Sequence, residues 1–269
     1  MRDVLGDQRW LVLTGAGVST DSGIPDYRGH GAPVRTPMTY QQFVSGADAQ
    51  QRYWARAHLG WSRMGGAEPN VTHHRLVELE SGGRLSGLIT QNVDGLHRRA
   101  GHRDLVELHG RVDRVVCLDC GDRTTRSRIQ HSLDRLNPGW TAQDVQVAPD
   151  GDAILEATEG YRVATCERCG GRLKPDVVFF GENVRKEIVE RCYRLTDEAE
   201  ALVVLGSSLQ VMSGLRFVRR ARANGVPVVI VNRGSTRGDD LADVRVDAGC
   251  AETLAAWVTA SSLSRTFVS

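Results

Sequence analysis

Cysteine spacing gives the chain its clearest indication of metal chemistry. Four of the six cysteines form two Cys-x-x-Cys pairs, Cys117 with Cys120 and Cys166 with Cys169. Each pair places two thiolates on one tight turn, which suits tetrahedral zinc, and four thiolates leave no position open for catalysis. We therefore predict one structural zinc ion. A redox role is disfavoured because neither pair opens a helix after a strand. A nucleic-acid-binding zinc ribbon is disfavoured because the flanks carry few aromatic residues and mixed charge.

A turn of very small residues follows the first apolar stretch of the chain. The run Leu11–Thr14 leads into Gly15-Ala16-Gly17-Val18-Ser19. A buried parallel strand that ends in such a turn presents backbone N–H groups to a phosphate. The fingerprint of dinucleotide dehydrogenases is not met, because Thr20 stands at its third glycine and Arg35 at its acidic residue. A tight turn without any ligand would use the same glycines, so nucleotide binding needs further support.

Polar residues also close several other apolar runs. They are Gln91-Asn92-Val93-Asp94, His109-Gly110, Gly206-Ser207-Ser208 and Asn232. The carboxyl ends of parallel strands meet at one edge of a sheet, where α/β proteins bind ligands. We therefore expect these residues to share a crevice with the glycine turn.

Each of these polar positions has a simpler explanation when taken singly. Asp94 could be the N-cap of the next helix, His109 a structural histidine, and Ser207 and Ser208 the start of a helix. All of these residues follow predicted strands. A shared ligand site explains that common position better than three unrelated structural roles. The Gly- and Pro-rich segment Ser22–Gly29 is predicted to be a loop that covers the ligand.

Hydrophobic periodicity predicts the elements that would position these residues. Strands are expected at 10–14, 85–89, 104–108, 176–180, 201–205, 226–231 and 243–246, and helices at 2–8, 39–64, 73–80, 95–100, 184–200, 213–224 and 252–260. Apolar strands that alternate with helices indicate an α/β fold with a Rossmann-like, doubly wound parallel sheet. The cysteine segment and the helical insertion are expected to form a smaller lobe beside it.

Composition excludes several classes of partner. The formal net charge is +1, so we expect no nucleic acid and no anionic membrane as partners. No apolar run approaches the roughly 18 residues of a membrane span, and the first strand begins too early for a removable presequence. We therefore expect a cytoplasmic protein, either a monomer or a weak oligomer.

Several motifs, taken in order, resemble those of the sirtuins. They are Gly15–Ser19, Gly23-Ile24-Pro25-Asp26-Tyr27-Arg28, Thr90–Asp94, Leu108-His109-Gly110, the four cysteines, Phe179-Phe180-Gly181-Glu182 and Gly206–Leu209. The likeness covers roughly residues 10 to 255. Finer features resemble the class II branch, and within it the mitochondrial sirtuin-four type: Arg52–Arg56, Ala148–Asp152 and Gly170–Gly181.

The resemblance implies an NAD-dependent protein lysine deacylase that releases nicotinamide and O-acyl-ADP-ribose. Its partners would be acylated proteins, and its cofactors NAD as cosubstrate and one structural zinc ion. It implies an NAD-binding domain over 1–38, 71–115 and 175–260, a small lobe made of the helical insertion 39–70 and the zinc module 116–174, and a tail, expected to be disordered, over 261–269.

Site residues follow from the same resemblance. The pyrophosphate and the nicotinamide ribose would be held by Gly15, Ala16, Gly17, Ser19, Thr20, Ile24, Pro25, Asp26, Tyr27 and Arg28. The nicotinamide end would meet Gln91, Asn92, Val93 and Asp94, and the phosphate and adenosine end Gly206, Ser207, Ser208, Asn232, Arg233, Gly234 and Cys250. His109, with Asn92 and Asp94, would be catalytic, and Val178, Phe179, Phe180, Gly181 and Glu182 would pair with the substrate peptide.

Departures from the family pattern bear on the acyl group. Tyr27 replaces the commoner phenylalanine, and Tyr40 is followed three residues later by Phe43 rather than by an arginine that would bind an acidic acyl group. Tyr53 and Arg56 have that spacing but lie further along the chain. The class II likeness instead implies longer, lipoyl- or biotinyl-like acyl groups. Protein mono-ADP-ribosyl transfer and a non-catalytic NAD or ADP-ribose sensor are the alternative functions.

Overall fold

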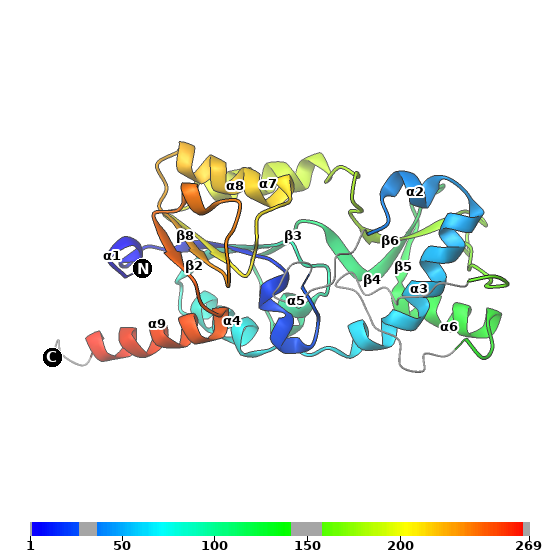
Figure 1. Ribbon diagram of the computed structural model, residues 1–269, viewed down its shortest axis with the longest axis horizontal. Coiled ribbons are helices and arrows are strands. Elements are labelled where there is room, and N and C mark those ends of the chain that lie inside the picture. The colour runs from blue at the N-terminus through cyan, green and yellow to red at the C-terminus, as the bar shows by residue number, and fades with distance from the viewer. Residues whose placement is uncertain (1, 27–36, 141–157, 266–269) are drawn as a thin grey trace.

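Residues 2–26, 37–140 and 158–265 are described by the structure, a computed structural model. Within these ranges it contains a six-stranded sheet and a separate three-stranded sheet (Figure 1). Two predicted site residues, Tyr27 and Arg28, lie outside the described residues, as does the motif Ala148–Asp152.

The larger sheet is parallel throughout, with the strand order β3-β2-β1-β7-β8-β9. Its strands are β1 (Trp10–Thr14), β2 (Leu85–Thr90), β3 (Leu105–Glu107), β7 (Ala201–Leu205), β8 (Val228–Val231) and β9 (Val244–Val246). The predicted doubly wound parallel sheet is confirmed. β1 lies at the centre of the sheet, with β2 and β3 on one side of it and β7, β8 and β9 on the other. The loops that follow β1 and β7 therefore diverge, and such a switch point is where open α/β sheets bind ligands.

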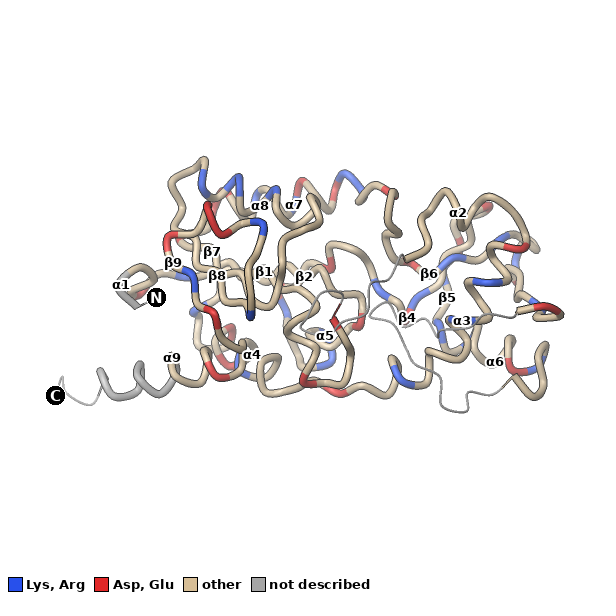
Figure 2. The backbone as a smooth tube through the Cα atoms, in the orientation of Figure 1, with Lys and Arg blue, Asp and Glu red and all other residues tan. Residues whose placement is uncertain are grey.

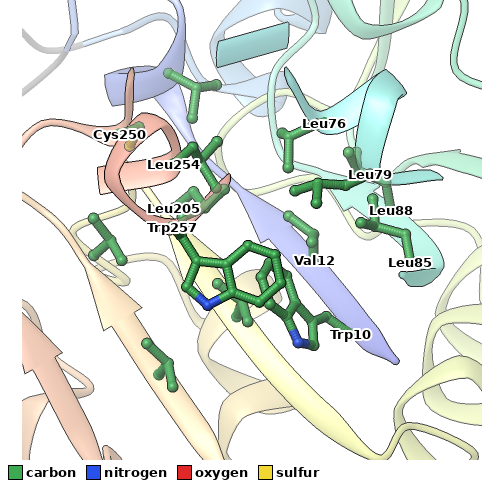
Figure 3. Close-up of a cluster of buried hydrophobic side chains, with 14 of the residues drawn as sticks. Trp10, Val12, Leu76, Leu79, Leu85, Leu88, Leu205, Cys250, Leu254 and Trp257 are labelled. Atoms are coloured by element: carbon green, nitrogen blue, oxygen red, sulfur yellow. The ribbon is translucent and has the colours of Figure 1, made fainter. Parts of the chain in front are cut away.

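Alternating side chains of β1 divide the core into two layers. Trp10 and Val12 belong to one buried cluster, and Leu11 and Leu13 to the other. The first cluster packs on helices α4 (Val71–Ser81) and α9 (Cys250–Arg265), and the second on α7 (Lys186–Asp197) and α8 (Met212–Ala223). Figure 1 shows these helix pairs on opposite sides of the sheet. Trp257 of α9 packs on Trp10 with ring centroids 4.2 Å apart (Figure 3), which anchors α9.

The smaller sheet has the order β5-β4-β6 and is antiparallel. It consists of β4 (Gly110–Cys117), β5 (Arg123–Thr125) and β6 (Leu173–Val177), and it gathers with α2 (Tyr40–Val44), α3 (Ala47–Gly66) and α6 (Arg126–Leu136) at one end of the molecule (Figure 1). One buried cluster joins Phe43 and Trp54 of these helices to Val115, Leu133 and Cys166. The boundaries of the two lobes stay a prediction. The shared core supports the assignment of the helical insertion and the zinc module to one lobe.

The strand predicted over 176–180 is wrong in two respects: it lies earlier in the chain, and it belongs to the smaller sheet. β6 ends at Val177 and pairs with β4 in the smaller sheet. Beyond it the chain turns, because the Glu182 N–H donates to the Phe179 carbonyl (3.0 Å) while the Glu182 side chain accepts from the Phe179 N–H (2.9 Å). An apolar run therefore ended in a turn that periodicity alone did not indicate.

Helix boundaries differ from the predictions at three places. The first helix, α1 (Arg2–Leu5), is shorter than predicted, and the single helix expected over 39–64 is divided between α2 and α3 at Ser45 and Gly46. The disordered tail expected from Ser261 is wrong up to Arg265, because α9 continues to that residue.

Helix α6 was not predicted because a charged residue occupies one of its core positions. Arg126 is 2% exposed and donates to the Ala57 carbonyl at 3.0 Å, while its guanidinium lies over the rings of Trp54 and Trp61. An arginine at a buried position removes the apolar period on which the prediction of a helix depends.

Charges are mixed over the surface of both halves. Figure 2 shows Lys and Arg interspersed with Asp and Glu along the outer helices, which agrees with the net charge of +1. In the described part of the chain, no helix is long and apolar enough to span a membrane.

Three histidines lie buried together beneath the carboxyl end of β1. The ring centroids of His73 and His97 are 4.7 Å apart, and those of His97 and His102 are 5.1 Å apart. His97 also contacts the Thr14 hydroxyl at 3.0 Å, while His102 lies 3.4 Å from Glu80. Burial lowers the pKa of all three rings, and that of His73 to about 4.

These histidines predict acid sensitivity of the fold. Below pH 6.5 the unfolded chain binds a proton at His73 that the folded chain does not bind until about pH 4, so stability falls as the pH decreases through this window. His73 alone accounts for about 2 kcal/mol by pH 5. The loss of unfolding free energy between pH 7 and pH 5, measured by urea titration, is expected to be smaller in His73→Asn than in the unaltered protein.

The matched control is His131→Asn, which changes an exposed histidine of α6 outside this cluster. It should keep the full pH dependence. An equal pH dependence in His73→Asn and the unaltered protein would contradict the prediction.

Candidate functional site

The turns after β1 and β7 touch backbone to backbone. The Gly15 N–H donates to the Leu205 carbonyl (3.1 Å), and the Gly17 N–H to the Gly206 carbonyl (2.8 Å). A Cβ atom at Gly17 would lie 2.9 Å from the Gly206 Cα, and one at Gly15 would lie 2.7 Å from the Ser207 Cβ. Glycine is therefore required at both positions for the two turns to meet at the switch point.

A polar cluster fills the edge of the sheet beside this turn. The Ser19 hydroxyl donates to the Asp94 carboxylate (2.7 Å), and the Asn92 amide donates to the Gly15 carbonyl and the Ser19 hydroxyl, both at 3.0 Å. The Leu96 N–H donates to the other Asp94 oxygen (2.8 Å), but the N-cap of α5 (Leu96–Ala100) is Gly95, so the simpler interpretation of Asp94 as the N-cap is wrong. Burial raises the pKa of Asp94, against these hydrogen bonds.

His109 is held from both ring nitrogens. Nδ1 lies 2.8 Å from the Gln91 carbonyl oxygen, and Nε2 lies 2.7 Å from the Ser213 hydroxyl. A carbonyl only accepts, so Nδ1 carries the proton and Nε2 is the basic nitrogen of the neutral ring. Burial lowers the pKa of His109, with a smaller contribution from Arg216, and this keeps the ring neutral near pH 7.

Gln91 connects His109 to the glycine turn. Its N–H donates to the Thr14 carbonyl (3.0 Å) at the end of β1, and its side-chain amide donates to the Ser207 hydroxyl (2.9 Å) after β7. The imidazole therefore lies at the same edge of the sheet as the two turns, and Gln91 contacts all three.

Predicted nucleotide residues also follow β8, at the same carboxyl end of the parallel sheet. Asn232 donates to the Arg233 carbonyl (2.8 Å), and the Gly234 N–H donates to Asp247 (2.9 Å), which shapes the turn after β8. Cys250 begins α9 inside the core, and burial raises the pKa of its thiol to about 12. That thiol is not a nucleophile.

The predicted peptide-binding segment is fixed to both the base and the small lobe. The Val178 N–H donates to the His109 carbonyl (2.8 Å). Lys174, 4% exposed, donates to the Glu182 carboxylate (3.1 Å), which also accepts the Phe179 N–H. Phe180 accepts from the Tyr40 N–H of α2 (2.9 Å). A half-buried ion pair and these backbone contacts fix the segment beside His109.

The four paired cysteines converge as a metal site requires. Their sulfur atoms all lie within 4.8 Å of one another; the Sγ atoms of Cys117 and Cys169 are 3.5 Å apart and those of Cys120 and Cys166 are 3.8 Å apart. A tetrahedral zinc ion with zinc–sulfur distances of about 2.3 Å needs sulfurs about 3.8 Å apart. The cluster therefore fits one zinc ion.

This cluster is far from the candidate base. His109 precedes β4 and Cys117 ends it, so the eight residues of the strand separate them, on the order of 20 Å. The zinc ion is therefore structural rather than part of the reaction centre.

Comparison with known proteins identifies the family. The Sir2 family model matches residues 15–213. NAD-dependent protein deacetylase 1 of Mycobacterium avium (strain 104) is 52% identical over 257 residues, which cover 94% of this chain and 91% of that protein. The chain belongs to the Sir2 family. The resemblance drawn from the sequence motifs is thereby confirmed.

A further relative and two solved structures are also similar to this sirtuin. The mitochondrial NAD-dependent protein lipoamidase sirtuin-4 of Bos taurus is 48% identical, with 92% of this chain and 81% of that protein covered. A solved structure of Sir2 with a p53 peptide and NAD+ has a TM-score of 0.76 and 29% identity, with 97% of each chain covered. A structure of Sir2Tm bound to a propionylated peptide has a TM-score of 0.74 and 29% identity, with 97% and 96% covered.

The sequence did not indicate every residue that shapes the sirtuin's site. It located the residues of the glycine turn, Asn92, Asp94, His109 and Ser207, and the structure brings these together; their roles toward NAD stay predictions. It gave no role to Ser213, Gly214 or Lys174. The position of Ser213 at the start of a helix predicted after a sheet-edge segment was the available signal, because such helix starts face the crevice.

The cysteine cluster predicts that zinc is needed for folding. Cys117→Ser should lower bound zinc, measured by elemental analysis, and produce insoluble or unfolded sirtuin. Cys192→Ala is the control, because this cysteine lies in α7 outside the cluster and should leave zinc content unchanged. A folded, zinc-free Cys117→Ser protein with an unaltered melting temperature would refute the structural role.

The contact between the two turns predicts a loss of NAD affinity in Gly17→Ala. The added methyl group forces the turn away from Gly206, which should weaken NAD binding at least tenfold in calorimetry and cost about 1–3 kcal/mol of stability. Gly46→Ala is the control, because no atom lies within 4 Å of its Cβ position and its backbone is extended. Unchanged NAD affinity in Gly17→Ala would count against the assignment of the turn.

Proposed function

We propose that this sirtuin, an NAD-dependent protein deacylase, favours lipoyl- or biotinyl-like acyl groups over acetyl on protein lysines. The observation that carries the assignment of its site is the link between His109 and the glycine turn through Gln91. A base at the edge where a parallel sheet binds nucleotides suits chemistry on the sugar of NAD. The products are nicotinamide and O-acyl-ADP-ribose.

Asn92 and Asp94 are proposed to bind the nicotinamide carboxamide. A carboxamide presents one acceptor and two donor hydrogens, and an amide beside a carboxyl group can match both. The raised pKa of Asp94 favours its protonated form, which can donate as well as accept. When bound, NAD supplies a glycosidic carbon that becomes electrophilic as nicotinamide departs.

His109 is proposed to be the general base. Its Nε2 takes a proton from a ribose hydroxyl, and the hydroxyl oxygen then attacks the acyl carbon. Because the pKa of His109 is lowered, the ring is unprotonated at neutral pH and loses this function only as the pH falls. General base catalysis of this kind contributes about 10²–10⁴-fold to the rate.

The preference for long acyl groups is supported by the surroundings of the peptide-binding segment. Phe179 of that segment packs on Phe43 and Tyr53, with ring centroids 5.2 Å and 5.3 Å apart. These rings are buried in the core of the smaller lobe. An apolar backing of this kind favours an extended apolar chain over a carboxylate. The name of the bovine relative, a lipoamidase, points in the same direction.

A panel of acylated peptides tests the proposal. With NAD present, kcat/KM for lipoyl- and biotinyl-lysine peptides should exceed that for the acetyl-lysine peptide at least tenfold, measured as O-acyl-ADP-ribose formed. His109→Ala should reduce turnover by about 10²–10⁴-fold while NAD affinity stays close to that of the unaltered sirtuin.

Other outcomes identify the alternatives. Faster removal of succinyl groups would instead assign Tyr53 and Arg56 to an acidic acyl group. Label transferred from NAD to protein without any acyl group would indicate mono-ADP-ribosyl transfer. Binding of NAD with no release of nicotinamide for any peptide would make the protein a sensor and remove His109 from its role.

A further inference from the structure

A serine outside the sequence motifs contacts the basic nitrogen of His109. The Ser213 hydroxyl lies 2.7 Å from Nε2, while the Gln91 carbonyl engages Nδ1. Because Nδ1 carries the proton, Nε2 has one lone pair, and in the free protein the Ser213 O–H donates to it. The atom assigned as the base is therefore already occupied.

The start of α8 is pressed against Gln91, and this brings Ser213 within reach. A Cβ atom at Gly214 would lie 2.4 Å from the Gln91 side-chain oxygen. A side chain at this position would displace the Gln91 amide, which the Ser207 hydroxyl holds at 2.9 Å. The same Gln91 holds Nδ1, so both contacts that fix the imidazole come from one packed junction between β2 and α8.

We propose that Ser213 is a positioning residue for His109. It holds the ring with Nε2 directed toward the crevice before substrate arrives, and it then yields Nε2 to the ribose hydroxyl. This proposal rests on the proposed function, in which that hydroxyl is the group deprotonated by His109.

Rotation of Ser213 about its Cα–Cβ bond makes the exchange possible. A serine side chain has three staggered positions, and Ser213 is only half-buried, so water can satisfy its hydroxyl after rotation. In the proposed reaction the ribose O–H bond would then break and its proton would move to Nε2. The electron pair of the oxygen would form the bond to the acyl carbon, and the π electrons of that carbon's double bond would move onto the lysine nitrogen. Ser213 neither gains nor loses a proton.

Steady-state kinetics of Ser213→Ala and Ser213→Thr test the proposal on the acyl peptide that the unaltered protein uses best. Ser213→Ala should lower kcat for O-acyl-ADP-ribose formation about tenfold, the rate equivalent of one hydrogen bond. Its KM values for NAD and for the peptide should stay within about twofold, because Ser213 is not assigned to bind either. Ser213→Thr keeps the hydroxyl and should restore most of the rate.

A matched control and an earlier step of the same reaction separate positioning from packing. Met212→Ala alters the neighbouring exposed residue at the start of α8 and should keep the kcat of the unaltered protein. Exchange of labelled nicotinamide into NAD precedes deprotonation of the ribose hydroxyl, so Ser213→Ala should leave its rate unchanged. An unaltered kcat in Ser213→Ala, or equal losses in Ser213→Ala and Ser213→Thr, would overturn the proposal.

Nitrogen-15 NMR of the imidazole distinguishes this proposal from the proposed function. In the protein without ligands, the Nε2 signal of His109 should move in Ser213→Ala and keep its position in Ser213→Thr. An unshifted Nε2 signal in Ser213→Ala would show that Ser213 does not contact His109. A signal that moves as expected, in a protein that deacylates no peptide, would refute the proposed function while the contact between Ser213 and His109 stands.

Discussion

Close contact between two backbone turns at the centre of the parallel sheet is the constraint on which the site depends. The Gly17 N–H reaches the Gly206 carbonyl at 2.8 Å, and neither glycine has room for a side chain. The loops after β1 and β7 diverge from the sheet, and this contact keeps their first residues together, so that the polar side chains beside them share one edge. The candidate site of this sirtuin therefore depends first on two positions without side chains and then on the polar side chains beside them.

Gln91 transmits this geometry to the base. Its side chain holds Ser207 on one side, and its carbonyl holds His109 on the other. The same residue limits how closely α8 approaches, through Gly214. The glycine turn, the imidazole and the start of α8 are thus joined through contacts with one residue.

The zinc cluster contributes at a distance. β4 begins directly after His109 and ends at Cys117, and β6, which precedes the peptide-binding segment, pairs with it. Metal coordination at one end of this sheet stiffens the strands whose other end carries His109 and Val178. The small lobe therefore holds the backbone around His109 in place, and the half-buried pair of Lys174 and Glu182 joins β6 to the predicted peptide-binding segment.

The sequence by itself determined the features carried by local pattern. Strand periodicity predicted the parallel sheet, cysteine spacing predicted the metal cluster, and the order of motifs identified the sirtuin family. Only the tertiary structure decided that residues 178–182 form a turn, that Arg126 is buried, and that Ser213 occupies Nε2 of His109. Such contacts join residues far apart in the chain; Ser213 follows His109 by 104 positions. A side chain's partner across that separation depends on how helices and strands pack, which no local spacing encodes.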